Sequence, residues 1–482
     1  MLLKDLYYES GKLGDIEIKG ITCNSKEVKP GFAFVCLKGA KSDGHKFAPD
    51  AEKAGAAVIF SESDLELENQ IVVKDTHECY FNLCAKWFGD PAKELKLIGV
   101  TGTNGKTSVT YMLKSIFEKA GYKTGLIGTI QNMIGEDVIE THNTTPDAFT
   151  LNKLFREMAD SGCKYVVMEV SSHALDQKRI CNVMFDIAVF TNLTQDHLDY
   201  HITMDNYLLA KKKLFKMCKK AVLNSDDPYF EKLKEGLDCK IITYSASNNS
   251  DYSAKGINYH PVGVEYELVE KGLIKHISVN TGGRFSVYNS LCAAVSAIES
   301  GIDIETVVTA LKELKGVKGR AEVVETGRDF TVIIDYAHTP DGLKNILSTF
   351  KECKKGRLVA VFGCGGDRDK TKRPIMGNVA VHYADYVIVT SDNPRSENPA
   401  SIINDILEGI KGIPTPVKVI ENRTEAIKFA ISNARKDDII VLAGKGHETY
   451  QILNTGTIHL DEREVVKEAL SELNNGGEKN NG

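Results

Sequence analysis

A phosphate-binding loop is the clearest chemical signal in the sequence. Gly102-Thr103-Asn104-Gly105-Lys106-Thr107 follows a short apolar run at 96–100 and precedes a stretch with helical spacing of apolar residues. The backbone N–H groups of such a loop and the N-terminus of the helix can surround phosphate oxygens. Lys106 would neutralise the terminal phosphates, and Thr107 would hold Mg²⁺. The strict motif has glycine where this chain has Val100, so the loop is a variant. We nevertheless predict nucleotide binding rather than a glycine turn with a solvated lysine.

Two further strand-like runs end in polar residues that could bind the cation. Glu169 follows the apolar residues 166–168 near the end of the run at 165–170, and Asp196-His197 follows the run at 185–190. Carboxyl ends of parallel strands face the ligand crevice, and Mg²⁺ prefers hard oxygen ligands. Either Asp196 or His197 could be a ligand, and a purely structural histidine is the alternative for His197.

Lys211 lies on an apolar stripe of a predicted helix over 206–215. Its helical neighbours three and four residues away are Tyr207, Leu208, Leu214 and Phe215. Burial favours the uncharged form of a lysine amine, which is nucleophilic. The alternative for Lys211 and the two lysines that follow it is a solvated basic face.

A parallel sheet is needed to position these residues. The apolar runs at 96–100, 165–170 and 185–190 alternate with helical stretches, and a similar pattern restarts after residue 322. Later runs lie at 331–334, 358–362, 386–389 and 439–442. We predict an α/β protein of three domains, as a length of 482 residues suggests. The domains are a small α/β module at 1–93, a P-loop ATPase-like parallel-sheet domain at 94–321 and a Rossmann-like doubly wound domain at 322–482. The polar tail from Asn474 is not expected to pack.

Composition excludes several classes of protein. A net charge of −6 gives no general positive field for nucleic acid or an anionic membrane. No apolar run approaches the roughly 18 residues of a membrane span, and a charge pair interrupts the first residues, so a cytoplasmic protein is expected. The eleven cysteines form no C-x-x-C pair, so neither zinc nor a disulfide framework is indicated.

Taken in order, these motifs resemble those of the Mur ligase family of peptidoglycan synthesis. The resemblance rests on the phosphate loop, on Glu169-Val170-Ser171-Ser172-His173 and on Thr191 to Asp199. Four later blocks are similar to the diaminopimelate-adding members: Asp335 to Pro340, Gly363 to Asp369 with Lys372-Arg373-Pro374, Ser391 to Arg395, and Gly444 to Glu448. The first domain carries Asn24-Ser25-Lys26, similar to the family's UDP-sugar module, so the resemblance covers essentially the whole chain.

The resemblance implies an ATP-dependent acid–amino-acid ligase. It would join meso-2,6-diaminopimelate to the γ-carboxylate of D-glutamate in UDP-N-acetylmuramoyl-L-alanyl-D-glutamate, through an acyl phosphate. This step belongs to cytoplasmic peptidoglycan precursor synthesis, and so to cell wall biogenesis, cell shape and cell division. The three domains would bind the UDP sugar, ATP and the amino acid, in that order, and a monomer is expected. The implied cofactors are Mg²⁺ and a CO₂-derived carbamate on Lys211, which would turn a cation into an anion able to bind the metal.

The same resemblance assigns roles to individual residues. The catalytic set is Lys106, Lys211, Glu169 and His197. The ATP-binding set is Gly102, Thr103, Asn104, Gly105, Lys106, Thr107, Ser108, Asn289, Arg320 and Asp335. The UDP-dipeptide set is Ser25, Asn143, Thr144, Thr145, Ser171, Gln177 and Arg179. The diaminopimelate set is Arg368, Asp392, Asn393, Pro394, Arg395, Gly444 and Glu448. The metal ligands are Thr107, Glu169, His197 and carbamylated Lys211.

Two departures from the family's pattern and several alternatives remain. The family's Pro-Gly-Arg is here Lys318-Gly319-Arg320, and its Phe-Asn-x-x-Asn is here 285–289 with Ser286 in second place. The alternatives are the same chemistry with L-lysine as the amine, a folylpolyglutamate synthetase, and a P-loop kinase or motor ATPase. A nucleic-acid-binding module is disfavoured by the charge, and dinucleotide binding at Gly363 to Gly366 is disfavoured because the glycine pattern fails at Arg368.

Overall fold

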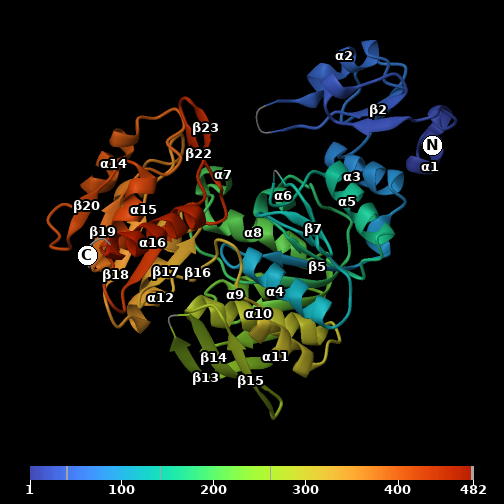
Figure 1. Ribbon diagram of the computed structural model, residues 1–482. Helices are drawn as coiled ribbons and strands as arrows, with labels where there is room; N and C mark the ends of the chain where they lie inside the picture. The colour runs from blue at the N-terminus through green and yellow to red at the C-terminus, as the bar shows by residue number, and fades with distance from the viewer. Residues whose placement is uncertain (40–41, 142, 261, 479–482) are drawn as a thin grey trace. The chain divides into compact units, whose positions relative to one another are not determined.

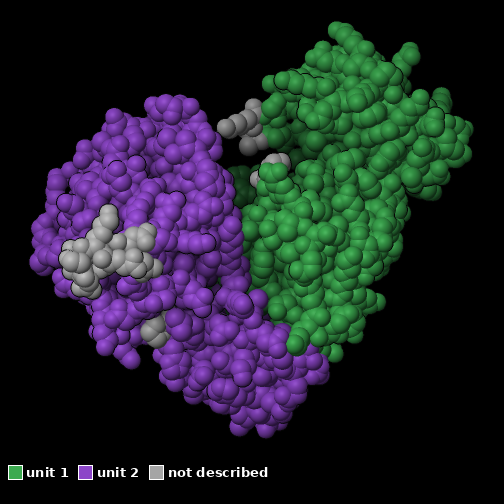
Figure 2. Space-filling view, viewed as in Figure 1, with its two compact units in different colours: residues 1–193, 197–244, 295–302 green, residues 194–196, 245–294, 303–482 purple. Residues whose placement is uncertain are grey.

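The computed structural model describes residues 1–39, 42–141, 143–260 and 262–478. The chain, drawn as a ribbon in Figure 1, forms two compact units, which Figure 2 distinguishes by colour. Unit 1 comprises residues 1–193, 197–244 and 295–302, and unit 2 comprises 194–196, 245–294 and 303–482.

The N-terminal part of unit 1 is a small parallel sheet with helices. Its strands lie in the order β1-β2-β3-β4, and buried Phe34 and Phe60 belong to its core. The elements are α1 (Leu3–Leu6), β1 (Gly20–Thr22), β2 (Phe32–Val35), α2 (Ala48–Lys53), β3 (Val58–Ser61), β4 (Gln70–Val72) and α3 (Thr76–Trp87). A short 3₁₀ turn, η2 (Ser25–Glu27), follows β1.

The larger sheet of unit 1 places the phosphate loop at its centre. Its strand order is β12-β11-β10-β5-β9-β6-β7-β8, parallel from β12 to β6 and antiparallel through β7 and β8. Its strands are β5 (Lys96–Thr101), β6 (Thr124–Ile127), β7 (Asn132–Ile134), β8 (Asp137–Ile139), β9 (Tyr165–Glu169), β10 (Phe185–Phe190), β11 (Cys218–Asn224) and β12 (Lys240–Ser245). Its helices are α4 (Lys106–Lys119), α5 (Ala148–Asp160), α6 (Ser172–Asp176), α7 (Leu198–His201), α8 (Met204–Phe215) and α9 (Phe230–Lys234). Glu169 pairs with Val100 and Phe190 with Thr101, so the carboxyl ends of β9, β5 and β10 meet at one edge.

Unit 2 contains an antiparallel ribbon and a doubly wound sheet. The ribbon is β13 (Tyr252–His260), β14 (Gly263–Glu270) and β15 (Leu273–Val279), and α10 (Arg284–Glu299) and α11 (Ile304–Glu313) follow it in the chain. The sheet has the order β16-β17-β21-β18-β19-β20. Its strands are β16 (Glu322–Val324), β17 (Thr331–Asp335), β18 (Leu358–Phe362), β19 (Tyr386–Val389), β20 (Val417–Val419) and β21 (Ile439–Ala443).

Helices cover both faces of this sheet, and each face has its own apolar core. One core contains residues of α12 (Pro340–Cys353), α13 (Lys372–Tyr383) and α14 (Pro399–Glu408), and the other contains residues of α15 (Arg423–Ser432) and α16 (Glu462–Glu478). A hairpin of β22 (Tyr450–Leu453) and β23 (Gly456–His459) precedes α16.

The α/β class with parallel sheets is confirmed, and β10, β18 and β19 have the bounds that their apolar runs predict. The division at residues 93 and 321 stays a prediction, since the two units do not test it. The ribbon β13 to β15 was not predicted. The tail from Asn474, predicted to be too polar to pack and to be disordered, is helical as far as Glu478, where α16 ends, so the prediction of disorder is wrong for 474–478. Residues 479–482 lie outside the described residues. Within the described ranges, no helix combines the length and apolar character that crossing a membrane requires.

A fully buried ion pair joins α15 to α16. Arg423 and Glu462 have no exposed side-chain surface, and Arg423 Nε donates to Glu462 Oε1 at 2.8 Å. Arg423 Nη2 also donates to the carbonyl of Ala443 at the end of β21, at 2.9 Å. A buried guanidinium needs such partners because its desolvation is costly.

We expect Glu462→Gln to destabilise unit 2 by roughly 3 kcal/mol, because it leaves a buried cation without its anion. Thermal unfolding should show a melting temperature several degrees below that of the wild type. Glu468→Gln is the matched control, since Glu468 lies on the same helix with its side chain 63% exposed. Equal melting temperatures for the two variants would contradict this account.

Candidate functional site

The phosphate loop is held against the end of β10 by a close backbone approach. Gly102 has φ +150°, and a Cβ there would lie 1.9 Å from Thr191 Oγ1, so only glycine fits. The Asn104 N–H donates to Asn192 Oδ1 at 2.9 Å, and Thr191 Oγ1 donates to the Asn104 carbonyl at 2.6 Å. Gly105 precedes α4 with φ +89° and has no side chain to cap the helix. The first turn of α4, which includes Ser108, therefore begins at the loop, as anion binding at a helix N-terminus requires.

Two lysine side chains meet at the carbonyl of Gly102. Lys106 Nζ and Lys211 Nζ each donate to this oxygen at 2.9 Å. Lys211 is 1% exposed, as its apolar neighbours predict, and its Nζ lies 4.5 Å from the centre of the Tyr207 ring. Both cations are thus held beside the loop where terminal phosphates would bind.

Glu169 presents a buried carboxylate to the same loop. Its side chain is 1% exposed, and Oε2 accepts from Thr107 Oγ1 at 3.0 Å. Oε1 accepts from the Thr129 backbone N–H at 2.9 Å, and Oε2 accepts from Thr129 Oγ1 at 3.1 Å. A Cβ on Gly128 would lie 2.5 Å from Oε1, so glycine is needed for this approach.

The donor chemistry of Thr107 and Glu169 fits Mg²⁺, which prefers oxygen ligands and keeps several waters. Within the part of the chain that the structure describes, no group of three or more His, Cys, Asp or Glu side chains could hold a metal. His197 has φ +53° and lies with its ring centre 4.8 Å from that of His173 and 6.1 Å from that of Tyr207.

Most of the predicted dipeptide-binding residues form one hydrogen-bonded group beside Glu169. Thr145 Oγ1 donates to the Glu169 carbonyl at 2.9 Å and accepts from the Ser171 N–H at 3.0 Å. Arg179 Nη1 donates to the Thr145 carbonyl at 3.3 Å, and Arg179 Nη2 donates to Gln177 Oε1 at 2.7 Å. The structure therefore gathers these four side chains at the end of β9.

The three other members of the predicted dipeptide-binding set lie outside this hydrogen-bonded group. Thr144 Oγ1 lies 3.0 Å from Thr129 Oγ1, which links it to the Glu169 carboxylate. Asn143 is exposed, and Ser25 begins η2 in the N-terminal sheet region. Among the described residues, no hydrogen bond joins Ser25 to the group at β9.

In unit 2, Asp335 anchors the segment that carries Arg320. Its carboxylate accepts the N–H groups of Ala321 at 2.7 Å and Ala337 at 2.8 Å. The Arg320 guanidinium lies 4.8 Å from the centre of the Tyr336 ring. Asn289 is a buried residue of α10.

The predicted diaminopimelate set converges on the loop after β19. Asn393 Nδ2 donates to Glu448 Oε2 at 2.9 Å, and Lys445 Nζ donates to the same oxygen at 3.0 Å and to Asn393 Oδ1 at 3.1 Å. Arg395 Nη1 donates to the Gly366 carbonyl at 2.9 Å.

Of the remaining members of the set, Asp392, Pro394 and Gly444 lie on the loops after β19 and β21, and Arg368 lies on the loop after β18. Asp392 and Pro394 are buried, and Gly444 has φ +123° with room for no Cβ, which would lie 2.6 Å from Asp392 Oδ2. Arg368 is exposed on its own loop and donates to the Asp367 carbonyl at 3.4 Å.

Sequence reasoning missed Thr129, Lys445 and Arg423. The first two follow a glycine at a strand end, as Gly128-Thr129 after β6 and Gly444-Lys445 after β21, and that position was a usable signal. Arg423 opens a helix, and nothing in its neighbourhood in the sequence indicates that it is buried.

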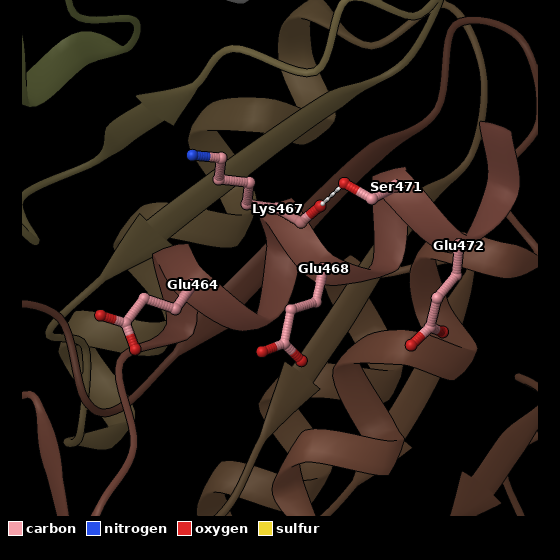
Figure 3. Close-up of a pocket in the computed structure, with 5 residues that line it drawn as sticks. All are labelled: Glu464, Lys467, Glu468, Ser471 and Glu472. Carbon is pink, nitrogen blue, oxygen red and sulfur yellow. Dashed lines mark hydrogen bonds between the residues drawn. The ribbon is translucent and has the colours of Figure 1, made fainter. Parts of the chain in front are cut away.

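A surface hollow along α16, about 520 Å³ in volume, contains none of the predicted site residues. It is lined by Glu464, Lys467, Glu468, Ser471 and Glu472, and Figure 3 shows Lys467 directed away from the glutamates. Ser471 Oγ donates to the Lys467 carbonyl within the helix at 2.9 Å. These residues form an acidic helix face and offer no converging chemistry.

Three family models match the chain. They are the "Mur ligase family, catalytic domain" at residues 17–85, the "Mur ligase middle domain" at 100–297 and the "Mur ligase, glutamate ligase domain" at 319–446.

Individual relatives match over nearly the whole length. A UDP-N-acetylmuramoyl-L-alanyl-D-glutamate--2,6-diaminopimelate ligase of Caldanaerobacter subterraneus subsp. tengcongensis is 50% identical over 98% of both chains. A ligase of the same name from Clostridium botulinum is 47% identical over 98% of this chain and 99% of its own. A solved structure with that name has a TM-score of 0.74 at 33% identity and covers 98% of this chain and 99% of its own.

A pH dependence of stability follows from His447. Burial, and after it the nearby cations with Arg320 first, together lower the pKa of this side chain to about 4. Between about pH 6.5 and pH 4 the unfolded chain binds a proton that the folded chain does not, so stability falls as the pH falls through this window.

We therefore expect the melting temperature of the wild type to fall between about pH 7.5 and about pH 5, and His447→Gln to remove part of that fall. His382→Gln, at an exposed histidine of α13, should leave the pH dependence unchanged. A His447→Gln variant with the wild-type pH profile would contradict this assignment.

Proposed function

The chain belongs to the Mur ligase family, and we propose that it joins meso-2,6-diaminopimelate to the D-glutamate γ-carboxylate of UDP-N-acetylmuramoyl-L-alanyl-D-glutamate. It is an ATP-dependent ligase of peptidoglycan synthesis. One observation carries the chemistry: the buried Glu169 carboxylate is hydrogen-bonded to Thr107 of the phosphate loop and, through Thr129, is linked to Thr144, a predicted dipeptide-binding residue. The nucleotide and the substrate carboxylate would thus meet at the carboxyl ends of neighbouring strands, at one edge of the sheet.

Amide formation from a carboxylate and an amine is unfavourable in water, so the carboxylate must first be activated. A γ-carboxylate oxygen attacks the γ-phosphorus of ATP, the bond to the β-phosphate oxygen breaks, and ADP leaves with an acyl phosphate remaining. Lys106 would turn from the Gly102 carbonyl to the transferred phosphate and offset its charge. The residues around Thr145 would hold the dipeptide so that its carboxylate lies in line with the phosphate.

The amine then completes the reaction. The uncharged amine of diaminopimelate attacks the acyl carbon, a tetrahedral intermediate forms, and the intermediate expels inorganic phosphate while the nitrogen loses a proton. Acyl phosphates react with water, so the groups around the reacting carbon must also exclude it.

Two accessory groups belong to the proposal. Thr107, Glu169 and His197 would hold Mg²⁺, which when bound offsets phosphate charge and orients the oxygens. Lys211 is buried beside the Gly102 carbonyl, where a carbamate on Nζ would supply an anionic oxygen ligand next to the loop. That the chain acts as a cytoplasmic monomer stays a prediction.

Amine selection is assigned to Arg395. Diaminopimelate differs from L-lysine by a carboxylate on its far carbon, and a planar guanidinium binds a carboxylate in bidentate fashion. Arg395 has φ +53°, and its Nη1 is tied to the Gly366 carbonyl. Among the described residues, Arg395 Nε and Nη2 donate no hydrogen bond. In the proposal, these two nitrogens bind the far carboxylate of the substrate.

We expect the wild type, given Mg-ATP and the UDP-dipeptide, to yield a product heavier by one diaminopimelate less one water, with stoichiometric ADP and phosphate. Mass spectrometry with a panel of amines reads this directly. A preference for L-lysine would overturn the amine assignment. A glutamylated folate would favour a folylpolyglutamate synthetase, and ADP release without any amine would favour a kinase or motor ATPase.

Arg395→Ala should lower kcat/KM for diaminopimelate roughly 10²-fold or more, because a desolvated charge pair is lost, while the KM for ATP changes little. The wild type should reject L-lysine on the order of 10⁴-fold, because the guanidinium would be left unpaired. Arg435→Ala, at an exposed arginine of the same unit, is the control. An Arg395→Ala variant that keeps its diaminopimelate kcat/KM would remove the substrate assignment and leave the ligase assignment standing.

A further inference from the structure

We propose that Thr129 is a positioning residue that couples the Glu169 carboxylate to the dipeptide-binding hydroxyl of Thr144. The inference deepens the proposed function and rests on it, because Thr144 is taken to contact the UDP-dipeptide. Thr129 lies between β6 and β7, and Thr144 lies in the segment before α5. The Thr129 hydroxyl lies where these two segments and the end of β9 meet.

Thr129 contacts Glu169 in two chemically different ways. Its backbone N–H donates to Oε1 at 2.9 Å, and its Oγ1 lies 3.1 Å from Oε2. Oε2 also accepts from Thr107 Oγ1 at 3.0 Å. The carboxylate therefore has two anchors that do not involve the Thr129 side chain, so the hydrogen bond from the Thr129 hydroxyl is not needed merely to hold it.

That purpose follows from counting hydroxyl protons. A threonine hydroxyl donates one hydrogen bond and can accept others, whereas an ionised carboxylate only accepts. Since Thr129 Oγ1 lies 3.1 Å from Glu169 Oε2, it must donate there. It can then only accept from Thr144 Oγ1, which lies 3.0 Å away. The direction of the chain is fixed: Thr144 donates to Thr129, and Thr129 donates to Glu169.

The direction has a functional consequence. With its proton committed to Thr129, Thr144 Oγ1 presents lone pairs, so it is set to accept a hydrogen bond from a donor group of the dipeptide, such as an amide N–H. Charge on Glu169 strengthens both hydroxyl bonds, because such chains are cooperative. Glu169 would thereby order the dipeptide site through two hydroxyls, without touching the dipeptide.

Local backbone structure keeps this chain short. A Cβ on Gly128 would lie 2.5 Å from Glu169 Oε1, so the backbone before Thr129 approaches the carboxylate as only glycine can. Thr129 is half-buried, and Glu169 is 1% exposed.

Thr129→Val keeps the shape and the backbone N–H but removes the hydroxyl. We expect it to weaken binding of the UDP-dipeptide about 10-fold, measured by calorimetry without ATP or Mg²⁺, and to leave the KM for ATP within about 2-fold. Thr129→Ser should restore the wild-type affinity. Thr124→Val is the matched control, because Thr124 is a fully buried threonine at the start of β6 whose hydroxyl donates only to the Tyr122 carbonyl at 3.0 Å.

A double-mutant cycle separates coupling from a general structural effect. If the hydroxyls act as one chain, Thr129→Val should weaken dipeptide binding little further in a Thr144→Val background. Additive losses, or a Thr129→Val variant that binds the dipeptide like the wild type, would overturn the proposal. Equal losses for both substrates with a lowered melting temperature would also overturn it, since they indicate a structural role. A wild type that does not bind the UDP-dipeptide would instead refute the proposed function.

Discussion

The close approach of Gly102 to the end of β10 is the constraint on which the site in unit 1 depends. A side chain at this position would collide with Thr191 Oγ1, so the loop can lie on β10 only because residue 102 has none. Its carbonyl then points to the place where Lys106 and Lys211 both donate. Two lysine side chains, one from α4 and one from α8, are therefore aligned by a single backbone oxygen. Preorganised charge of this kind is the main means by which a protein accelerates phosphoryl transfer.

Burial of Glu169 extends this arrangement to the second substrate. A carboxylate that is 1% exposed must be compensated by hydrogen bonds, and its donors are supplied by Thr107 of α4 and Thr129 after β6. Each donor comes from a different strand-end segment. The requirement to satisfy one buried carboxylate therefore fixes the relative positions of the phosphate loop and the β6–β7 connection. Because the buried carboxylate requires these donors, the two segments are held rigidly. Rigid positions of the reacting groups are what in-line transfer of a phosphoryl group needs.

Burial also decides which elements and site residues could be predicted from the sequence. Strands β10, β18 and β19 are continuous apolar runs because parallel strands are buried on both faces, so their bounds could be predicted from the sequence. The ribbon β13 to β15 was missed because many of its side chains are exposed, which removes that signal. The burial of Lys211 was predictable from its helical neighbours. For Thr129 and Lys445 the glycine at a strand end was a usable signal of position, but their particular roles were not predictable, because these arise from contacts with residues far along the chain.

Unit 2 uses the same principle at the amine end. The Asn393 side chain accepts from Lys445 Nζ and from the Ile452 N–H and donates to Glu448, so it is held on both its oxygen and its nitrogen. Lys445 is fully buried and also donates to Glu448 Oε2, which fixes this carboxylate through one oxygen. These hydrogen bonds orient Asn393, Lys445 and Glu448 with respect to one another. In the proposed function, selectivity for a far carboxylate would come from a cation outside this network, and Arg395, whose side-chain hydrogen bonds among the described residues all come from Nη1, is the residue proposed for it.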